Sequence, residues 1–236
     1  MYYRYYKNSN VNITIVLLHG WGVDSKYMES LKDLLIEDYS ILLIDLPGHG
    51  ESKLNKEYNM DNYIDELFYI VTKENIKNLY GIGHSFGGKV LSYYSLKYPL
   101  LGGILIAPST YKPQFSLSKY IKIYLYKLLK RMHLKIPKFL LGSQDYRLTD
   151  GIKRKTFLNV VNFYLSKNEL NKIITPIIIM GFKYDHAVKI KQLKKLNKYF
   201  VNSKLFIYDG DHFSYFSYLK EIKIFINYLI RGEFEW

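Results

Sequence analysis

The sequence contains no cysteine among its 236 residues. This absence excludes a disulfide framework, a thiolate metal site and a thiol nucleophile. The six histidines include neither an HExxH motif nor a closely spaced pair. A zinc site built from histidine and carboxylate ligands is therefore not indicated either.

Long apolar runs are also missing. No run approaches the roughly 18 residues that a membrane-spanning helix requires. The first ten residues, MYYRYYKNSN, contain no apolar leader segment. We therefore expect a cytoplasmic protein, and the length fits one domain with room for an insertion.

Acidic residues are few relative to basic ones. The chain has 34 lysine and arginine residues and 21 aspartate and glutamate residues, which gives a net charge of +13. Only five of the basic residues are arginine, and alanine occurs twice. This composition indicates a genome-wide bias, so basicity alone does not predict nucleic-acid binding, and we expect no nucleic-acid partner. Most of the excess is local, since residues 111–172 carry 14 basic and three acidic residues, a net charge of +11.

Short β-branched apolar runs bounded by turn residues predict buried strands. They lie at 13–18, 40–46, 79–83, 103–107, 177–181 and 204–208. Segments with helical periodicity separate them, at 26–36, 61–73, 86–97, 187–200 and 215–230. This alternation predicts an α/β fold with a mostly parallel central sheet flanked by helices. The opening YYRYY, followed by VNITIVLL, is expected to form an antiparallel edge hairpin.

One connection is much longer than the others, since about 65 residues separate the strand ending near Ala107 from the next strand. We interpret 111–171 as an inserted helical cap, with 1–110 and 172–236 forming the core. Its first half has apolar residues at helical spacing and basic residues on other faces. We expect this helix to pack over the sheet as a lid; a membrane-surface helix is the alternative. The apolar positions are Leu117, Tyr120, Ile121, Tyr124, Leu125, Leu128, Leu129 and Met132.

The segment Gly83-His-Ser-Phe-Gly87 fits the pattern G-x-S-x-G between a predicted strand and a predicted helix. In such a nucleophile elbow, a strained backbone makes the hydroxyl of Ser85 project from the turn. Gly83 and Gly87 have no side chains that would collide with neighbouring elements. A nucleotide-binding loop is the alternative, because glycines also precede a helix here. Position 86 is Phe where the dinucleotide motif requires glycine, which favours the nucleophile.

A serine nucleophile needs a base, and position along the chain favours His212. It follows the last predicted strand, from which a loop can carry it back to the serine. His19 and His49 lie in glycine-rich turns, where structural hydrogen bonding is expected. His133 lies in the cap, and His84 would project away from the reacting centre.

The imidazole also needs a carboxylate, and Asp185 lies four residues beyond Gly181, just past the preceding strand. Asp209 and Asp211 are nearer to the histidine in sequence, but we interpret them as loop-shaping residues. The sequence therefore predicts Asp185 as the acid.

Two backbone N–H groups are needed to stabilise a developing oxyanion. Phe86, directly after the serine, would supply one. Trp21 would supply the other from the loop LLHGWG, where Gly20 and Gly22 let the backbone approach the reacting centre.

These motifs together resemble the α/β-hydrolase superfamily in order and spacing, over essentially the whole chain. The resemblance implies Ser85, Asp185 and His212 as nucleophile, acid and base, and a helical cap. It is strongest toward small carboxylesterases such as the pimeloyl-carrier-protein methyl-ester esterases. The family often has a proline shortly after the acid, where this chain has 187–189 as AVK, so that loop is expected to differ. The motifs are HGWG at 19–22, DLPGHGES at 45–52, GHSFGG at 83–88 and GDH at 210–212.

The resemblance implies ester hydrolysis through an acyl-enzyme on Ser85, without a metal or organic cofactor. A lysophospholipase or monoacylglycerol-type lipase, a carbon–carbon bond hydrolase and a slow-turnover ligand receptor are the alternatives. The apolar content of the cap suggests a pocket for an acyl chain. Its positive charge leaves three possibilities open: an acidic acyl-carrier protein, an anionic membrane surface, or composition bias without a partner.

Overall fold

The protein is described by a computed structural model that covers the backbone of residues 1–113, 117–137 and 144–233. Side chains are described for these residues except 117–120 and 144.

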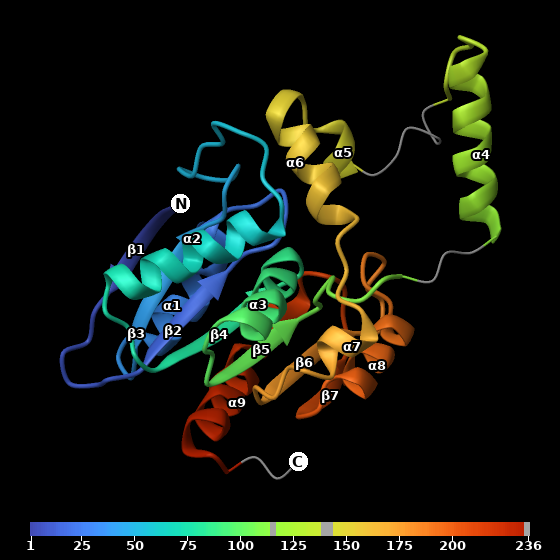
Figure 1. Ribbon diagram of the computed structural model, residues 1–236. Helices are drawn as coiled ribbons and strands as arrows, with labels where there is room; N and C mark the ends of the chain where they lie inside the picture. Colours follow the sequence, from blue (N-terminus) through green and yellow to red (C-terminus); the bar gives the residue numbers. More distant parts are fainter. Residues whose placement is uncertain (114–116, 138–143, 234–236) are drawn as a thin grey trace.

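A seven-stranded sheet in the order β1-β3-β2-β4-β5-β6-β7 forms the centre of the molecule (Figure 1). All pairings are parallel except that between β1 and β3. The predicted α/β architecture is therefore confirmed. The strands are Tyr2–Tyr6 (β1), Thr14–Leu18 (β2), Ser40–Asp45 (β3), Leu79–His84 (β4), Gly102–Ile106 (β5), Ile177–Phe182 (β6) and Ser203–Tyr208 (β7).

The first strand does not form the expected hairpin. β1 lies antiparallel to β3, with Tyr2 opposite Asp45, and not beside β2. The expectation was wrong because β2 has no free edge, since β3 and β4 pair with its two sides. The N-terminal segment therefore takes the open edge of β3.

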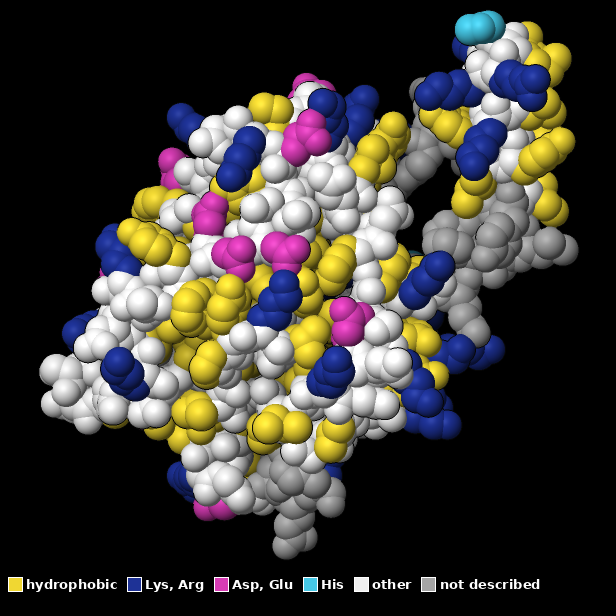
Figure 2. Space-filling view, in the orientation of Figure 1, with side chains coloured by type: hydrophobic (Ala, Val, Ile, Leu, Met, Phe, Trp, Pro, Cys, Tyr) yellow, Lys and Arg dark blue, Asp and Glu magenta, His cyan; other side chains and the backbone are white. Residues whose placement is uncertain are grey.

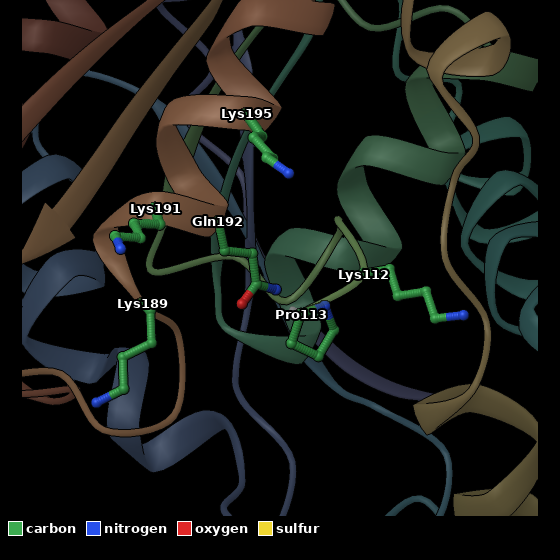
Figure 3. A pocket seen from close by; sticks show the side chains of 6 residues that line it. All are labelled: Lys112, Pro113, Lys189, Lys191, Gln192 and Lys195. Carbon is green, nitrogen blue, oxygen red and sulfur yellow. The ribbon is translucent and has the colours of Figure 1, made fainter. Parts of the chain in front are cut away.

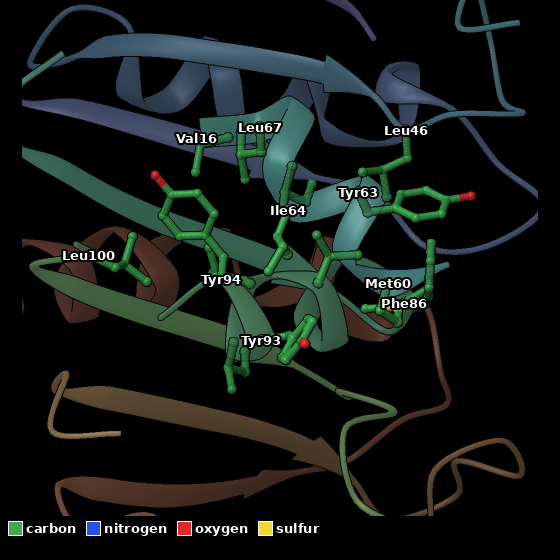
Figure 4. Packing of buried hydrophobic residues seen from close by; sticks show 14 of the residues in the cluster. Val16, Leu46, Met60, Tyr63, Ile64, Leu67, Phe86, Tyr93, Tyr94 and Leu100 are labelled. Carbon is green, nitrogen blue, oxygen red and sulfur yellow. The ribbon is translucent and has the colours of Figure 1, made fainter. Parts of the chain in front are cut away.

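Helices cover both faces of the sheet and bury two apolar clusters against it (Figure 1). On one face, Leu67 of α2 lies near Tyr94 of α3 and Val16 of β2, and Tyr63 of α2 packs on Phe86 (Figure 4). On the other face, α1 and α9 pack against the sheet. The helices are η1 (Ser25–Met28), α1 (Glu29–Leu35), α2 (Met60–Lys73), α3 (Phe86–Lys97), α8 (Ile190–Tyr199), η3 (Ser214–Tyr218) and α9 (Leu219–Arg231).

The long connection between β5 and β6 is helical in its described parts. It contains α4 (Leu117–Arg131), α5 (Gln144–Arg147), α6 (Gly151–Val161) and α7 (Lys167–Leu170). Phe157 of α6 is buried and packs against Trp21 of the core, with ring centroids 5.0 Å apart. The second half of the insertion therefore covers the core.

Helix α4 instead stands away from the sheet (Figure 1). Most of its described apolar side chains are exposed, with Ile121 at 51% and Tyr124 at 66% of their full accessible surface. The expectation that this stripe packs over the sheet was therefore wrong, and it is α6 that packs on Trp21. The side chains of Leu117 and Tyr120, which we also assigned to the stripe, lie outside the described residues.

Candidate active site

Ser85 lies on the tight turn between β4 and α3, with φ of 49° and ψ of −105°. A Cβ at Gly83 would lie 2.6 Å from the carbonyl oxygen of Gly87. A Cβ at Gly87 would lie 2.3 Å from the carbonyl oxygen of Leu18. Because backbone atoms leave no room at either position, the turn around Ser85 requires both glycines.

Asp185 and His212 meet although 27 residues separate them in sequence. His212 Nδ1 donates to Asp185 Oδ2 at 2.7 Å, and Asp185 is 2% exposed. Its other oxygen, Oδ1, accepts from the backbone N–H groups of Ala187 at 2.7 Å and Val188 at 2.8 Å. These donors fix the carboxylate, and a proline at position 187 could not provide the first of them.

His84 connects the serine turn to the loop that carries His212. Its Nε2 donates to the backbone oxygen of His212 at 2.9 Å, and the two rings are 4.8 Å apart. Burial lowers the pKa of His84 to about 3, so the ring is neutral. No hydrogen bond joins the Ser85 hydroxyl to His212 in the described part of the chain.

The two glycine-rich motifs of the sequence are held together by histidines. His19 Nδ1 donates to the Gly20 carbonyl at 2.7 Å, and its Nε2 accepts from the Leu46 N–H at 2.9 Å. His49 Nε2 accepts from the Gly22 N–H at 3.1 Å. Burial lowers the pKa of both rings, that of His49 to about 3, which keeps these nitrogens available as acceptors. Both histidines therefore have the structural role expected for them.

The expected oxyanion loop runs against the serine turn. A Cβ at Gly20 would lie 3.5 Å from Ser85 Cβ and 3.0 Å from His84 Nδ1. The Trp21 ring packs on the Phe86 ring, with centroids 5.3 Å apart. Phe86 is the first residue of α3, where backbone N–H groups have no acceptor within the helix. Both expected oxyanion donors thus belong to backbone segments next to Ser85.

Asp45, which the sequence did not single out, shapes the second glycine-rich loop. Its Oδ1 accepts from the Ser25 N–H at 2.8 Å and its Oδ2 from the Glu51 N–H at 2.9 Å. A Cβ at Gly50 would collide with this carboxylate. Although burial acts to raise it, these hydrogen bonds lower the pKa of Asp45. The signal in the sequence was the DLPGHGES motif itself.

Two further residues connect the insertion to the site. Asp145 of α5 lies next to Gly22: its Oδ1 would be 3.5 Å from a Cβ added at that glycine. Burial raises the pKa of the Asp145 carboxyl group.

Lys89 of α3 is 2% exposed, and its Nζ donates to the carbonyls of Val160 at 3.0 Å and Phe163 at 2.9 Å. Burial lowers the pKa of Lys89 to about 7. No sequence pattern indicated either contact.

A cavity of about 120 Å³ lies beside the loop that follows Asp185. Figure 3 shows that Lys112 extends to one side, and Lys189 and Lys191 to the other. They therefore surround the cavity with positive charge without converging on one bound anion. The lining residues are Lys112, Pro113, Lys189, Lys191, Gln192 and Lys195.

Two kinds of feature are absent from the described residues. They include no group of three or more histidine or carboxylate side chains arranged to hold a metal ion. They also include no helix with the length and apolar character needed to span a membrane.

Comparison with known proteins places these observations in a family. The sequence pattern of the family described as "alpha/beta hydrolase fold" matches residues 13–132, which is more than half of the chain. A relative from Wigglesworthia glossinidia brevipalpis, named pimeloyl-[acyl-carrier protein] methyl ester esterase, is 25% identical over 91% of this chain and 94% of its own. A proline iminopeptidase from Saccharolobus solfataricus is 27% identical over 72% of this chain, which spans only 54% of that protein.

A solved structure from Clostridium acetobutylicum, described as a lipase-esterase related protein, has the same fold. It superposes with a TM-score of 0.73 over 97% of this chain and 98% of that one, at 23% identity. A sequence identity of 23% shows a shared fold and does not show a shared reaction.

Proposed function

Since this chain belongs to the alpha/beta hydrolase fold family, we propose that it is a carboxylic ester hydrolase with Ser85 as its nucleophile. The observation that carries this proposal is the strained backbone of Ser85, with φ of 49°, at the end of β4. The Asp185–His212 pair follows β6 and β7 at the same edge of the parallel sheet. Active sites of open parallel sheets lie at this edge.

The reaction begins when His212 Nε2 takes the proton of the Ser85 hydroxyl. Its Nδ1–H remains donated to Asp185, which holds the tautomer and stabilises the imidazolium. The serine oxygen attacks the ester carbonyl carbon, and the N–H groups of Trp21 and Phe86 stabilise the oxyanion. Collapse of this intermediate releases the alcohol, which takes the proton from the imidazolium. Water, deprotonated by His212, then hydrolyses the acyl-enzyme.

We propose esters as the substrate class because the relative that matches over most of both chains is named a methyl ester esterase. The apolar rings of Trp21, Phe86 and Phe157, which pack on one another beside the serine turn, suit an apolar acyl group. The mechanism uses only side chains and backbone N–H groups of this chain and water. We therefore propose no cofactor.

Labelling with a fluorophosphonate probe tests the nucleophile. The wild type should be labelled, Ser85→Ala should not, and Ser217→Ala, which removes an exposed hydroxyl in η3, should be labelled like the wild type. Competition with acyl esters of graded chain length then measures the size of the acyl pocket. Labelling of Ser85→Ala at the wild-type rate, or no labelling of folded wild type, would contradict the proposal.

A further inference from the structure

Helix α4 and the residues after it form a basic, exposed segment. Residues 117–137 contain six basic residues and no acidic one. Every described side chain in 121–137 is exposed except three that are half-buried, Tyr126, Leu129 and Ile136. This charge and this exposure belong to a segment that the proposed chemistry does not use.

One side of α4 is apolar, and basic side chains border it and cover much of the remaining surface. At 100° per residue, Ile121, Tyr124 and Leu128 fall on one side, together with Leu125 and Met132. Figure 2 shows hydrophobic side chains along the outer edge of this helix, turned away from the body of the protein. The basic side chains lie on the remaining surface, and they are Lys122, Lys127, Lys130 and Arg131.

We propose that α4 is a docking surface for an anionic lipid membrane. The helix would lie in the plane of the interface, with Ile121, Tyr124 and Leu128 among the acyl chains and the lysines at the phosphate groups. Long lysine and arginine side chains at the border of the apolar face extend toward the headgroups. This docking is independent of Ser85, so it can fail without affecting the proposed chemistry.

Other occupants match only one of the two faces. A second copy of α4 would cover the apolar face but bring two uniformly basic segments together, which repel. An acidic carrier protein would pair with the basic face and leave the outward apolar face in water. The described part of the protein does not cover this face, since Ile121, Tyr124 and Leu128 are exposed. An anionic bilayer offers negative charge and an apolar interior together.

The structure provides a matched pair of variants for the test. Leu128 is 39% exposed on the apolar face, and Ile123 is 40% exposed on the basic face. Leu128→Asp and Ile123→Asp therefore add the same charge at positions of equal exposure. If α4 inserts its apolar face, only the first change places a carboxylate in the acyl region.

Binding of the full chain to vesicles is measured by sedimentation, with phosphatidylcholine alone and with added phosphatidylglycerol. Wild type should bind only the anionic vesicles, and added salt should weaken this binding. Leu128→Asp should weaken it at least about tenfold, and Ile123→Asp by no more than about threefold. Both variants should hydrolyse a small soluble ester at the wild-type rate, which shows that they fold.

Three results would overturn the proposal. If the wild type does not bind anionic vesicles, the membrane is excluded as the partner, whether or not the protein binds an acidic carrier protein. Equal weakening by both variants shows attraction by net charge without an inserted face. Light scattering that finds a dimer dissociated by Leu128→Asp, without vesicle binding, assigns the face to a second copy.

Discussion

At Ser85 the backbone adopts a conformation that L-residues rarely occupy, with a free-energy cost of about 1–3 kcal/mol. The surrounding residues hold it there: Gly83 and Gly87 allow close backbone contact, and Ser85 N–H donates to the Ile106 carbonyl at 2.8 Å. The glycine spacing predicted this turn because it reflects a local steric demand. The link from His84 to His212 was not predicted, because no sequence pattern marks a hydrogen bond from a side chain to a distant backbone carbonyl.

The buried ring of His84 makes stability depend on pH. Its pKa is about 3 in the folded protein and about 6.5 when exposed, so folding favours the neutral ring. Its contribution to stability is complete above pH 6.5 and is lost as the pH falls toward 3. His84→Gln keeps a donor for the His212 carbonyl but does not titrate. In urea unfolding below pH 6, its free energy of unfolding should fall less steeply than that of wild type, by up to about 1.4 kcal/mol per pH unit.

His186→Gln is the control for this titration, because His186 is exposed. Its stability should follow the wild-type pH dependence. Parallel curves for His84→Gln and wild type would show that the His84 ring is not held neutral by burial.

Sequence patterns predicted whether a segment is a helix or a strand better than they predicted which other element it packs against. The prediction of alternating strands and helices was correct because the spacing of apolar residues reports which side of an element is buried. The partner of β1 was wrong because pairing depends on which edge of the finished sheet is open. Amphipathicity showed that α4 has an apolar face, but it carries no information on what covers that face.

Lys89 should determine how firmly α6 is attached to the core. Its ammonium group donates to two carbonyls at the end of α6, those of Val160 and Phe163, and lies 4.5 Å from the centre of the Tyr164 ring. Lys89→Met keeps an apolar stem but loses both bonds. The exchange is measured near pH 6, below the lowered pKa of Lys89 of about 7, so that the group is an ammonium ion. Hydrogen exchange followed by mass spectrometry should then be at least about tenfold faster in α6 peptides, because buried hydrogen bonds from charged groups contribute about 1.5–3 kcal/mol.

Lys97→Met is the matched control on the same helix, since Lys97 pairs with Asp61 at the exposed surface. Such pairs contribute little, so exchange in α6 should stay at the wild-type rate. Equal acceleration by both variants would indicate a general loss of stability in α3 without a specific anchor.

For the whole molecule, the parallel sheet brings the proposed chemistry together from distant parts of the chain. Ser85, Asp185 and His212 follow three different strands, and their order is readable from motifs because each loop leaves the same sheet edge. The net positive charge lies mostly outside the core, because residues 111–172, which contain the insertion, carry +11 of the net +13. We therefore propose that the core carries out the reaction and that the insertion docks on a membrane.

Turnover of a p-nitrophenyl ester, followed together with the mass of the protein during the reaction, is a direct test of Ser85 as the nucleophile. Wild type should turn over many times and carry the acyl group on the peptide containing Ser85. Ser85→Ala should lose the adduct and at least about 10⁴-fold in kcat. An acyl group on another residue, or a Ser85→Ala variant with the wild-type rate, would contradict the account.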